Sequence, residues 1–343
     1  MNRLEACKLT NKKMVFRHVN FKNQNFLLLM AIFVICAIVA IINPKFLTGR
    51  NIINLFQTIS IVGILSLGVG VVILTGNIDL SIANMVSFLA CLLGRLLLTN
   101  TINDKNILFV GLLLGMLCGC VNGIIVAFTN VDSFIITLAC ASVYYGLALL
   151  SSDGYDIFIT NFQWFGSYRF FDVVPIQTVL YVTLAIIMAL VMRYTTFGRS
   201  IYAVGGNAEA AYVSGINVKL HKLLAYIICG MLCSISAMII LSKLSGANAT
   251  MASGYDMDSI TACVVGGISL IGGRGDIFGC FLGVLLMGVI SNALNIMAVP
   301  VFYQEIISGC VLLMAVILRS NPDYKKIIKR IRSFVAAKSL KSE

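Results

Sequence analysis

Long apolar runs separated by short polar stretches dominate this chain. A helix needs roughly 20 mostly apolar residues to cross the hydrocarbon core of a bilayer, and a helix satisfies its own backbone hydrogen bonds there. Ten runs approach that length, near residues 26–42, 55–75, 80–98, 107–128, 133–150, 174–192, 223–242, 257–271, 277–296 and 302–318. The pattern therefore predicts an all-α fold, a polytopic membrane bundle of about ten transmembrane helices.

Two of these runs are weak candidates for complete spans. Arg95 lies inside the third run, and the eighth is short and follows Asp256 and Asp258. Either one is a candidate for a broken or re-entrant helix.

Composition points to the same class. Of the 343 residues, 59% are hydrophobic and 11% are charged, whereas an ordinary soluble domain carries about 25% charged residues. The mean hydropathy of +0.97 excludes such a domain, so the chain is expected to be an integral membrane protein.

Basic residues divide the chain into three regions. Most Lys and Arg residues fall in an N-terminal arm (1–25), a polar loop (193–222) and a C-terminal tail (319–343), which flank or interrupt a membrane domain (26–318). Cytoplasmic segments collect such residues, so both termini and the loop are predicted to be cytoplasmic. The net charge of +11 then reflects topology, aided by anionic lipid headgroups, and does not indicate nucleic acid.

The polar loop 193–222 carries the signals of a short helix. Asn207 is a favourable N-cap, Glu209 falls in the first turn and Gly215 is placed to end the helix. A helix of about two turns is marginal in water by itself. We therefore expect it to be stable when docked, which fits a contact with another protein. An ordinary amphipathic connector explains the same residues equally well.

Glycine spacing suggests close helix packing and an internal repeat. Two series recur at near-helical spacing, Gly111, Gly115, Gly119 and Gly279, Gly283, Gly288, and small residues let helices approach closely in lipid. Each series follows an acidic turn, around Asp79 in the first half and Asp256 in the second. The copies lie five spans apart, an odd offset that reverses orientation, so the pattern predicts an inverted repeat with a transport route between the halves or along a symmetric partner.

Several chemical functions find no support in the residues. The 11 cysteines lie mostly inside apolar runs without zinc-site spacing, so no metal or cofactor is expected. The two histidines, His18 and His221, lie in predicted cytoplasmic segments. A G-x-x-x-x-G-K-[ST] phosphate loop is missing from the sequence. The chain is therefore expected to be neither an enzyme nor its own source of energy.

Six segments carry a specific resemblance. ILTGNIDLS (73–81), VNGIIVAF (121–128), SFIITLA (133–139), the run 193–218, the run 254–275 and YQEIISG (303–309) resemble, in the same order, the ribose-type permease subunits of bacterial ABC sugar importers. The resemblance covers about residues 45–318. It implies a multi-pass protein of the bacterial cell membrane, a cytoplasmic loop that docks on an ATPase subunit, an extracytoplasmic solute-binding protein and a second permease chain, identical or paralogous.

The resemblance also assigns roles to particular residues. The loop matches the family pattern GGN-x-x-AA-x-x-SGI, which implies an ATPase-coupling helix whose small side chains lie close to the partner; the matching residues are Gly206, Asn207, Ala210, Ala211, Ser214 and Gly215. Phe134 and Thr137 match an FI-x-TL segment, although Asp132-Ser133 stands where many relatives have prolines. That departure leaves any gate at this place undefined.

Polar residues inside a membrane are functional candidates by default. The expected translocation path comprises Asp79, Ser81, Asn122, Phe134, Thr137, Asp256 and Asn292. For the aspartates, capping of a helix start is favoured over substrate contact. For the two asparagines, hydrogen bonding between helices and lining of a sugar path stay equally open. Arg95 is expected to snorkel to the outer interface or to pair with a carboxylate.

The function expected from these features is that of a membrane-spanning permease subunit in an ATP-driven importer for a simple, ribose-like sugar. Alternatives are an importer of the same architecture for a nucleoside or a sugar-like signal molecule, a self-contained secondary carrier driven by an ion gradient, and a scaffold that transports nothing.

Overall fold

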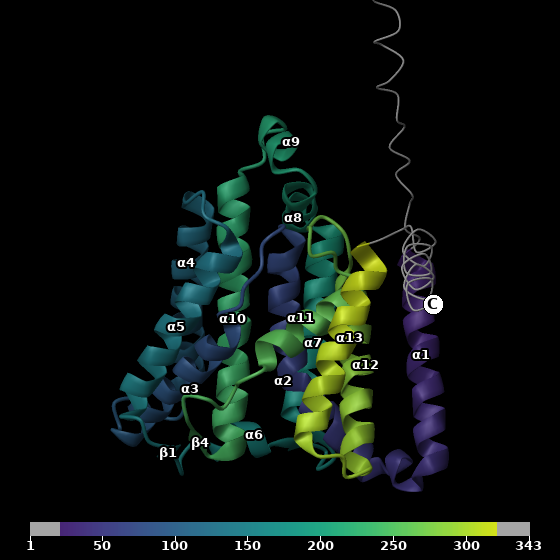
Figure 1. The fold of residues 1–343 in the computed structure, drawn as a ribbon. Helices are drawn as coiled ribbons and strands as arrows, with labels where there is room; N and C mark the ends of the chain where they lie inside the picture. Colours follow the sequence, from purple (N-terminus) through teal and green to yellow (C-terminus); the bar gives the residue numbers. More distant parts are fainter. Residues whose placement is uncertain (1–20, 321–343) are drawn as a thin grey trace, which may run out of the picture.

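The computed structural model describes residues 21–320 as a bundle of long helices with very little sheet (Figure 1). In chain order the helices are α1 (Phe21–Ile42), the 3-10 helix η1 (Pro44–Leu47), α2 (Gly49–Leu74), α3 (Ile82–Leu98), α4 (Ile107–Phe128), α5 (Ser133–Ser152), α6 (Gln163–Ser167), α7 (Ile176–Tyr194), α8 (Thr196–Gly206), α9 (Ala208–Val213), α10 (Val218–Leu244), α11 (Tyr255–Val265), α12 (Ile277–Ile296) and α13 (Val301–Ser320).

Two short antiparallel strand pairs lie among the loops. Strand β1 (Ile157–Phe158) pairs with β4 (Gly246–Ala247), and β2 (Arg169–Phe170) pairs with β3 (Val174–Pro175). In Figure 1, β1 and β4 lie at the end of the bundle opposite α9.

Each of the ten predicted runs contains a helix, which confirms the all-α, polytopic membrane fold. Within residues 21–320, seven helices are long and apolar enough to cross a membrane: α1, α2, α4, α5, α7, α10 and α12. The apolar parts of α3 and α13, Ile82–Leu98 and Val301–Ile317, are shorter. Helix α11 has only 11 residues, about 17 Å at 1.5 Å per residue against a core of about 30 Å. The predicted eighth span, 257–271, is thus too short to cross alone.

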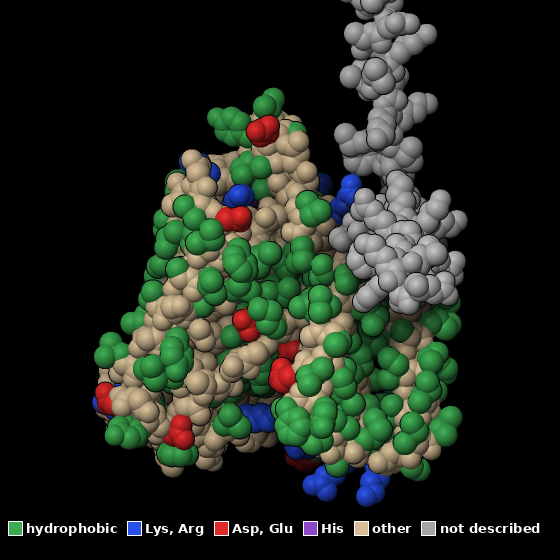
Figure 2. Space-filling model, in the orientation of Figure 1, with side chains coloured by type: hydrophobic (Ala, Val, Ile, Leu, Met, Phe, Trp, Pro, Cys, Tyr) green, Lys and Arg blue, Asp and Glu red, His purple; other side chains and the backbone are tan. Residues whose placement is uncertain are grey.

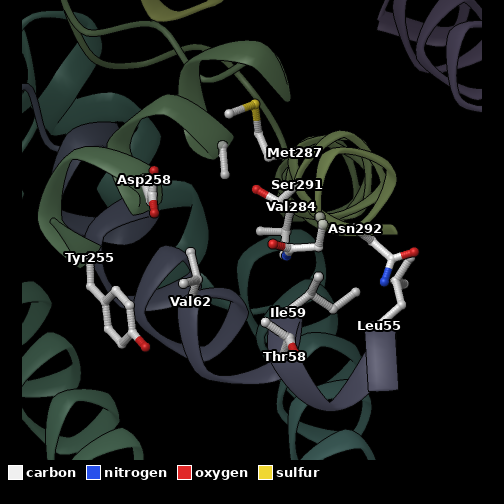
Figure 3. A pocket seen from close by; sticks show the side chains of 13 residues that line it. Leu55, Thr58, Ile59, Val62, Tyr255, Asp258, Val284, Met287, Ser291 and Asn292 are labelled. Carbon is white, nitrogen blue, oxygen red and sulfur yellow. The ribbon is translucent and has the colours of Figure 1, made fainter. Parts of the chain in front are cut away.

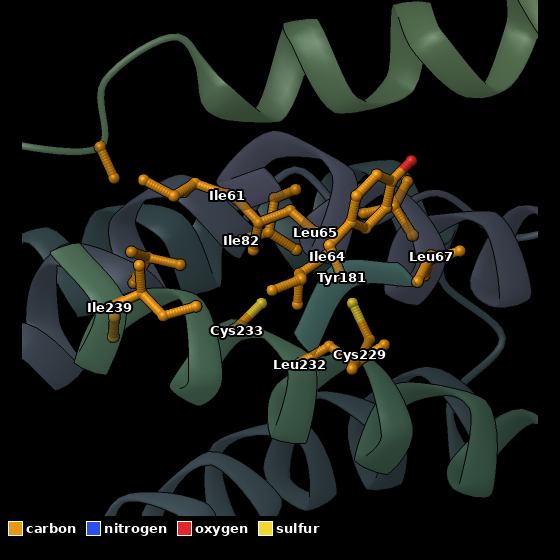
Figure 4. Close-up of a cluster of buried hydrophobic side chains, with 14 of the residues drawn as sticks. Ile61, Ile64, Leu65, Leu67, Ile82, Tyr181, Cys229, Leu232, Cys233 and Ile239 are labelled. Atoms are coloured by element: carbon orange, nitrogen blue, oxygen red, sulfur yellow. The ribbon is translucent and has the colours of Figure 1, made fainter. Parts of the chain in front are cut away.

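Helix α2 forms the centre of the bundle. In the apolar stretch of α2 that could cross a membrane, 83% of the residues are buried inside the protein. The corresponding share is 11% for α1, which lies at the edge of the bundle (Figure 1). Ile64 and Leu65 of α2 meet Tyr181 of α7 and Cys233 of α10 in the buried core (Figure 4). Helix α2 is therefore enclosed by protein, whereas α1 presents its apolar side chains outward.

Both glycine series lie at close helix contacts, as predicted. A Cβ atom at Gly115 would lie 2.4 Å from the carbonyl oxygen of Gly230 in α10, and one at Gly119 would lie 2.3 Å from that of Tyr226. On α12, a Cβ atom at Gly283 would lie 2.0 Å from the carbonyl oxygen of Ala262 in α11. These distances leave room for hydrogen only, so glycine sets how closely these helices pack.

Helices α4 and α12, which carry the two series, run in opposite directions. The last turns of α4 meet the first turns of α10 near α9, where Gly123 packs on Leu223. Helix α12 begins toward the α9 end of the bundle and runs away from it (Figure 1). An inverted repeat requires this arrangement, and the repeat itself stays a prediction.

The chain between α2 and α3 is irregular although it is surrounded by helices. Side chains from other helices take up its backbone groups: Ser133 Oγ accepts from Ile78 N at 3.1 Å, and Thr137 Oγ1 accepts from Leu80 N at 3.2 Å. The hydroxyl of Tyr226 donates to Ile78 O at 3.2 Å. Non-helical backbone is tolerated inside a membrane protein only where such partners exist.

The first described turn of α1 and the last of α13 both lie at the α9 end of the bundle (Figure 1). The predicted basic arm (1–25) and tail (319–343) fall almost entirely outside the described residues.

Candidate functional site

Helix α9 projects from one end of the bundle (Figure 1). Its first turn is closed by Asn207, whose Oδ1 accepts from Ala210 N at 2.9 Å, and Glu209 lies in that turn. Gly215 follows with a φ of +84°, a conformation that glycine adopts without strain. The cap and stop signals in the sequence thus produce the predicted short helix, of 6 residues.

The outward face of α9 differs from the one expected. Ala211 is only 4% exposed and turns toward its own chain, so it does not belong to a contact face with Ala210 and Ser214. Tyr212 is 73% exposed and Val213 is 85% exposed, and hydrophobic side chains gather at this tip in Figure 2. Neither residue was predicted to be part of the contact, although two large apolar residues inside a polar loop were a visible signal.

A hydrogen-bonded network joins three of the predicted path residues, Asp79, Ser81 and Asn122. Asp79 is 1% exposed, and its Oδ1 accepts from the backbone N of Ser81 at 2.9 Å and from its hydroxyl at 2.6 Å. Asn122 donates to Ser81 Oγ at 2.7 Å, and the hydroxyl of Tyr144 donates to Asn122 Oδ1 at 2.9 Å. Together with the bond that Leu80 N donates to Thr137 Oγ1, this network holds the 75–81 segment against α4 and α5.

These bonds favour a structural part for Ser81, Asn122 and Thr137, because their polar groups bond to one another, to Asp79 and to backbone. Asp79 Oδ1 bonds to Ser81 in the same way, whereas its Oδ2 is buried without a hydrogen-bond partner among the described residues. Phe134, by contrast, is 48% exposed, although its backbone oxygen lies 3.4 Å from Thr137 Oγ1. Asp132 stands at the N-cap position of α5 with extended backbone, so the substitution for proline still starts the helix there.

A cavity of about 160 Å³ opens between α2, α11 and α12. Polar and aromatic groups from all three helices face it (Figure 3), and its polar lining consists of Thr58, Tyr255, Asp258, Ser291, Asn292 and Asn295. Leu55, Ile59 and Val62 form an apolar wall on α2. Hydroxyl, amide and carboxylate groups beside an apolar wall suit a small solute with several hydroxyl groups.

Two contacts fix polar side chains of this cavity. Asn292 and Asn51 exchange amide hydrogen bonds at 2.9 and 3.0 Å. Asp258 Oδ1 accepts from Ser308 Oγ of α13 at 3.0 Å. The cavity lining therefore includes Asn292 and Asp258 but not Asp256. Tyr255, Ser291 and Asn295 also line it and were not among the path residues predicted from the sequence, although their clustering near two helix ends was a usable signal.

The comparisons with known proteins define the class. Residues 51–316 match the family described as "Branched-chain amino acid transport system / permease component", and the chain belongs to this family. It is thus a transport permease of the cell membrane and not an enzyme.

Similar proteins cover most of the chain. The "Ribose import permease protein RbsC" of Bacillus subtilis is 36% identical over 293 residues, which cover 84% of this chain and 90% of that protein. The "L-arabinose ABC transporter permease protein AraH" of Azospirillum brasilense is 33% identical, with 84% and 86% covered. The "D-allose transport system permease protein AlsC" of Escherichia coli is 32% identical, with 83% and 89% covered. No solved structure matches the chain.

Proposed function

We propose that this chain is the membrane-spanning permease subunit of an ATP-driven ABC importer for a simple, ribose-like sugar. The observation that carries the proposal is the projecting α9 tip, a capped short helix with two exposed apolar side chains, on a bundle whose sequence lacks a phosphate loop. Such a permease needs a separate ATPase subunit, and the tip offers a surface to which that subunit can bind. Similar proteins named for ribose, arabinose and allose support the sugar class.

The ATPase subunit docks on α9 in this proposal. Tyr212 and Val213 enter a groove of the ATPase, while Asn207, Gly206 and Gly215 define the start and end of the helix, and Ala210 and Ser214 let it lie close. Ala211 seats the helix on its own chain. Burial of apolar side chains on binding supplies the affinity, and a docked helix escapes the instability of a short free one.

Orientation follows from the same contact. The α9 end is cytoplasmic, and since both described chain ends lie there (Figure 1), both termini are cytoplasmic. The opposite end then receives an extracytoplasmic solute-binding protein. Exposed aromatic residues at Tyr155, Phe158, Trp164, Tyr168 and Phe171 lie in the connection between α5 and α7 and offer a contact surface there.

The cavity between α2, α11 and α12 is the proposed sugar contact, with Asn292, Asp258 and Ser291 as hydrogen-bonding groups. A second permease chain, identical or paralogous, completes the path across the membrane. The proposed path also includes Phe134 on the exposed side of α5 and Asp256 near the cavity. Its helices are positioned by Asp79, Ser81, Asn122 and Thr137.

Reconstitution tests the proposal. The chain is placed in liposomes with its ATPase, its solute-binding protein and enclosed ATP, and uptake of radiolabelled ribose, arabinose and allose is measured. We expect uptake of at least one sugar that requires both ATP and the binding protein. Uptake driven by an ion gradient without an ATPase would refute the proposal and favour a secondary carrier. A nucleoside taken up in preference to every sugar would replace the substrate class and keep the architecture.

A further inference from the structure

Three backbone segments meet at glycine residues beneath α9. They are the turn after α2 at Gly76, the end of α8 at Gly205, and the turn between α11 and α12 at Gly272 and Gly273. We call these four residues the glycine junction. Figure 1 shows α8 beside the upper end of α2.

The contacts in the junction are between backbone atoms. A Cβ atom at Gly205 would lie 1.9 Å from the carbonyl oxygen of Leu74 and 2.7 Å from Gly273 N. A Cβ atom at Gly272 would lie 2.6 Å from the Cα of Gly76. Gly272 also has a φ of +94°, which a larger residue adopts only with strain. The end of α8 therefore packs between the other two segments through backbone contacts, with no side chain between them.

Two hydrogen bonds tie the same segments together. Gly273 N donates to Leu74 O at 3.0 Å, which links the α11–α12 turn to α2. The hydroxyl of Tyr202 in α8 donates to Gly275 O at 3.0 Å. Burial raises the pKa of Tyr202 to about 12, and the nearby charge of Asp276 adds to the effect. This hydroxyl therefore keeps its proton, and remains a donor, at neutral pH.

The elements joined here also form the cavity. Helices α2, α11 and α12 line the cavity, and the junction fixes the end of α2 against the turn that connects α11 to α12. Helix α9 follows α8 after a single residue, Asn207, so only a very short linker connects the tip to the junction. A displacement of α9 would therefore reach the end of α2 and the α11–α12 turn through α8.

We propose that the glycine junction is the positioning element that carries motion of α9 to the cavity between α2, α11 and α12. The inference rests on the proposed function, because it takes α9 to be the part that the ATPase moves. Gly205 and Tyr202 act through the cavity helices and do not touch the solute. Closely packed backbone transmits displacement because it cannot yield by changing rotamers.

Two variants and one control test this role in the complete complex with its ATPase and binding protein in liposomes. Gly205→Ala forces a methyl group against Leu74 O, and Tyr202→Phe removes the bond to Gly275 O without changing the ring. Gly49→Ala is the matched control, because it also adds one methyl group to an end of a helix, α2, where nothing lies within 4 Å. The readouts are ATPase co-purification, ATP hydrolysis and uptake of whichever of ribose, arabinose or allose the unmodified complex transports.

We expect Gly205→Ala to retain the ATPase and to hydrolyse ATP, while the number of sugar molecules imported per ATP falls about tenfold, within the usual range of coupling between sites. Tyr202→Phe lowers the same ratio by a smaller factor, and Gly49→Ala leaves it unchanged. A merely structural role would lower uptake and hydrolysis together and leave the ratio intact.

An unchanged ratio in both Gly205→Ala and Tyr202→Phe would overturn the inference. If Gly205→Ala does not insert stably, Tyr202→Phe decides alone, and an unchanged ratio in that variant overturns it. Failure of the proposed function is distinguishable, since the unmodified complex would then import no sugar with ATP at all.

Discussion

The exposed tip of α9 allows a quantitative test of ATPase docking. In the double variant Tyr212→Ala, Val213→Ala, the helix cap at Asn207 and the seating of Ala211 are untouched, so α9 keeps its structure. Because 73% of Tyr212 and 85% of Val213 is exposed, most of their apolar surface is free to be buried by a partner. The variant therefore removes contact area without opening a cavity in the bundle.

The size of the effect follows from this area. Truncation of Val213 removes two methyl groups, worth about 1.6 kcal/mol at about 0.8 kcal/mol each. Truncation of a central interface tyrosine costs about 2–4 kcal/mol. The sum of about 4 kcal/mol or more corresponds to a loss of about a thousandfold in affinity.

The assay is equilibrium binding of the purified ATPase to the permease in lipid nanodiscs. Ile41→Ala on α1 is the matched control, since Ile41 is 83% exposed and lies near the opposite end of the bundle. We expect its Kd to equal that of the unmodified chain. A Kd for the double variant within about threefold of that value, less than 1 kcal/mol, would refute the assignment of the tip as the docking surface.

Three further predictions concern stability, measured by thermal or denaturant unfolding in detergent. Gly119→Ala places a methyl group 2.3 Å from Tyr226 O and should destabilise the bundle by about 1–3 kcal/mol. Gly146→Ala is the control and should change stability little, because nothing lies within 4 Å of the added methyl group. Equal effects of the two variants would contradict the close α4–α10 contact. Asn122→Ala leaves the hydroxyls of Ser81 and Tyr144 without this partner and should cost about 1–3 kcal/mol; an unaltered midpoint would show that the network contributes nothing. Arg95→Ala breaks a 3.0 Å ion pair with Asp153 in which both side chains are exposed, and a loss well above about 1 kcal/mol would contradict a surface pair.

Most of the fold was accessible from the sequence, because membrane helices are encoded by local hydropathy. The ten apolar runs all became helices, and Asn207 and Gly215 delimit α9 as their capping preferences indicate. Helix α11 is the exception. Its apolar run continues past Val265, where the helix ends with Gly266 as its C-cap. Gly267 has a φ of +110°, and Ile268 N donates to Cys263 O at 2.9 Å, so a glycine stop ends the helix. Hydropathy alone does not report such a stop.

The site was less accessible, because the direction of a side chain depends on tertiary packing. In a helix of 6 residues, a small rotation decides whether Ala211 or Tyr212 faces outward, and no periodicity can be read from so few positions. Likewise, Asp79 and Asn292 are both polar residues in apolar surroundings, but one bonds to Ser81 in a buried network and the other lies beside a cavity. Only the spatial arrangement of their neighbours separates these two cases.

The irregular segment between α2 and α3 has a consequence for biogenesis. Its hydrogen-bond partners Ser133, Thr137 and Tyr226 are translated after it, so a nascent chain that has not yet produced α10 leaves Ile78 O without its Tyr226 donor. We therefore expect the hydrogen bonds of this segment to be completed only once α10 has been inserted. A protein truncated before α10 should be recognised as incomplete and degraded, whatever the hydropathy of the helices that it retains.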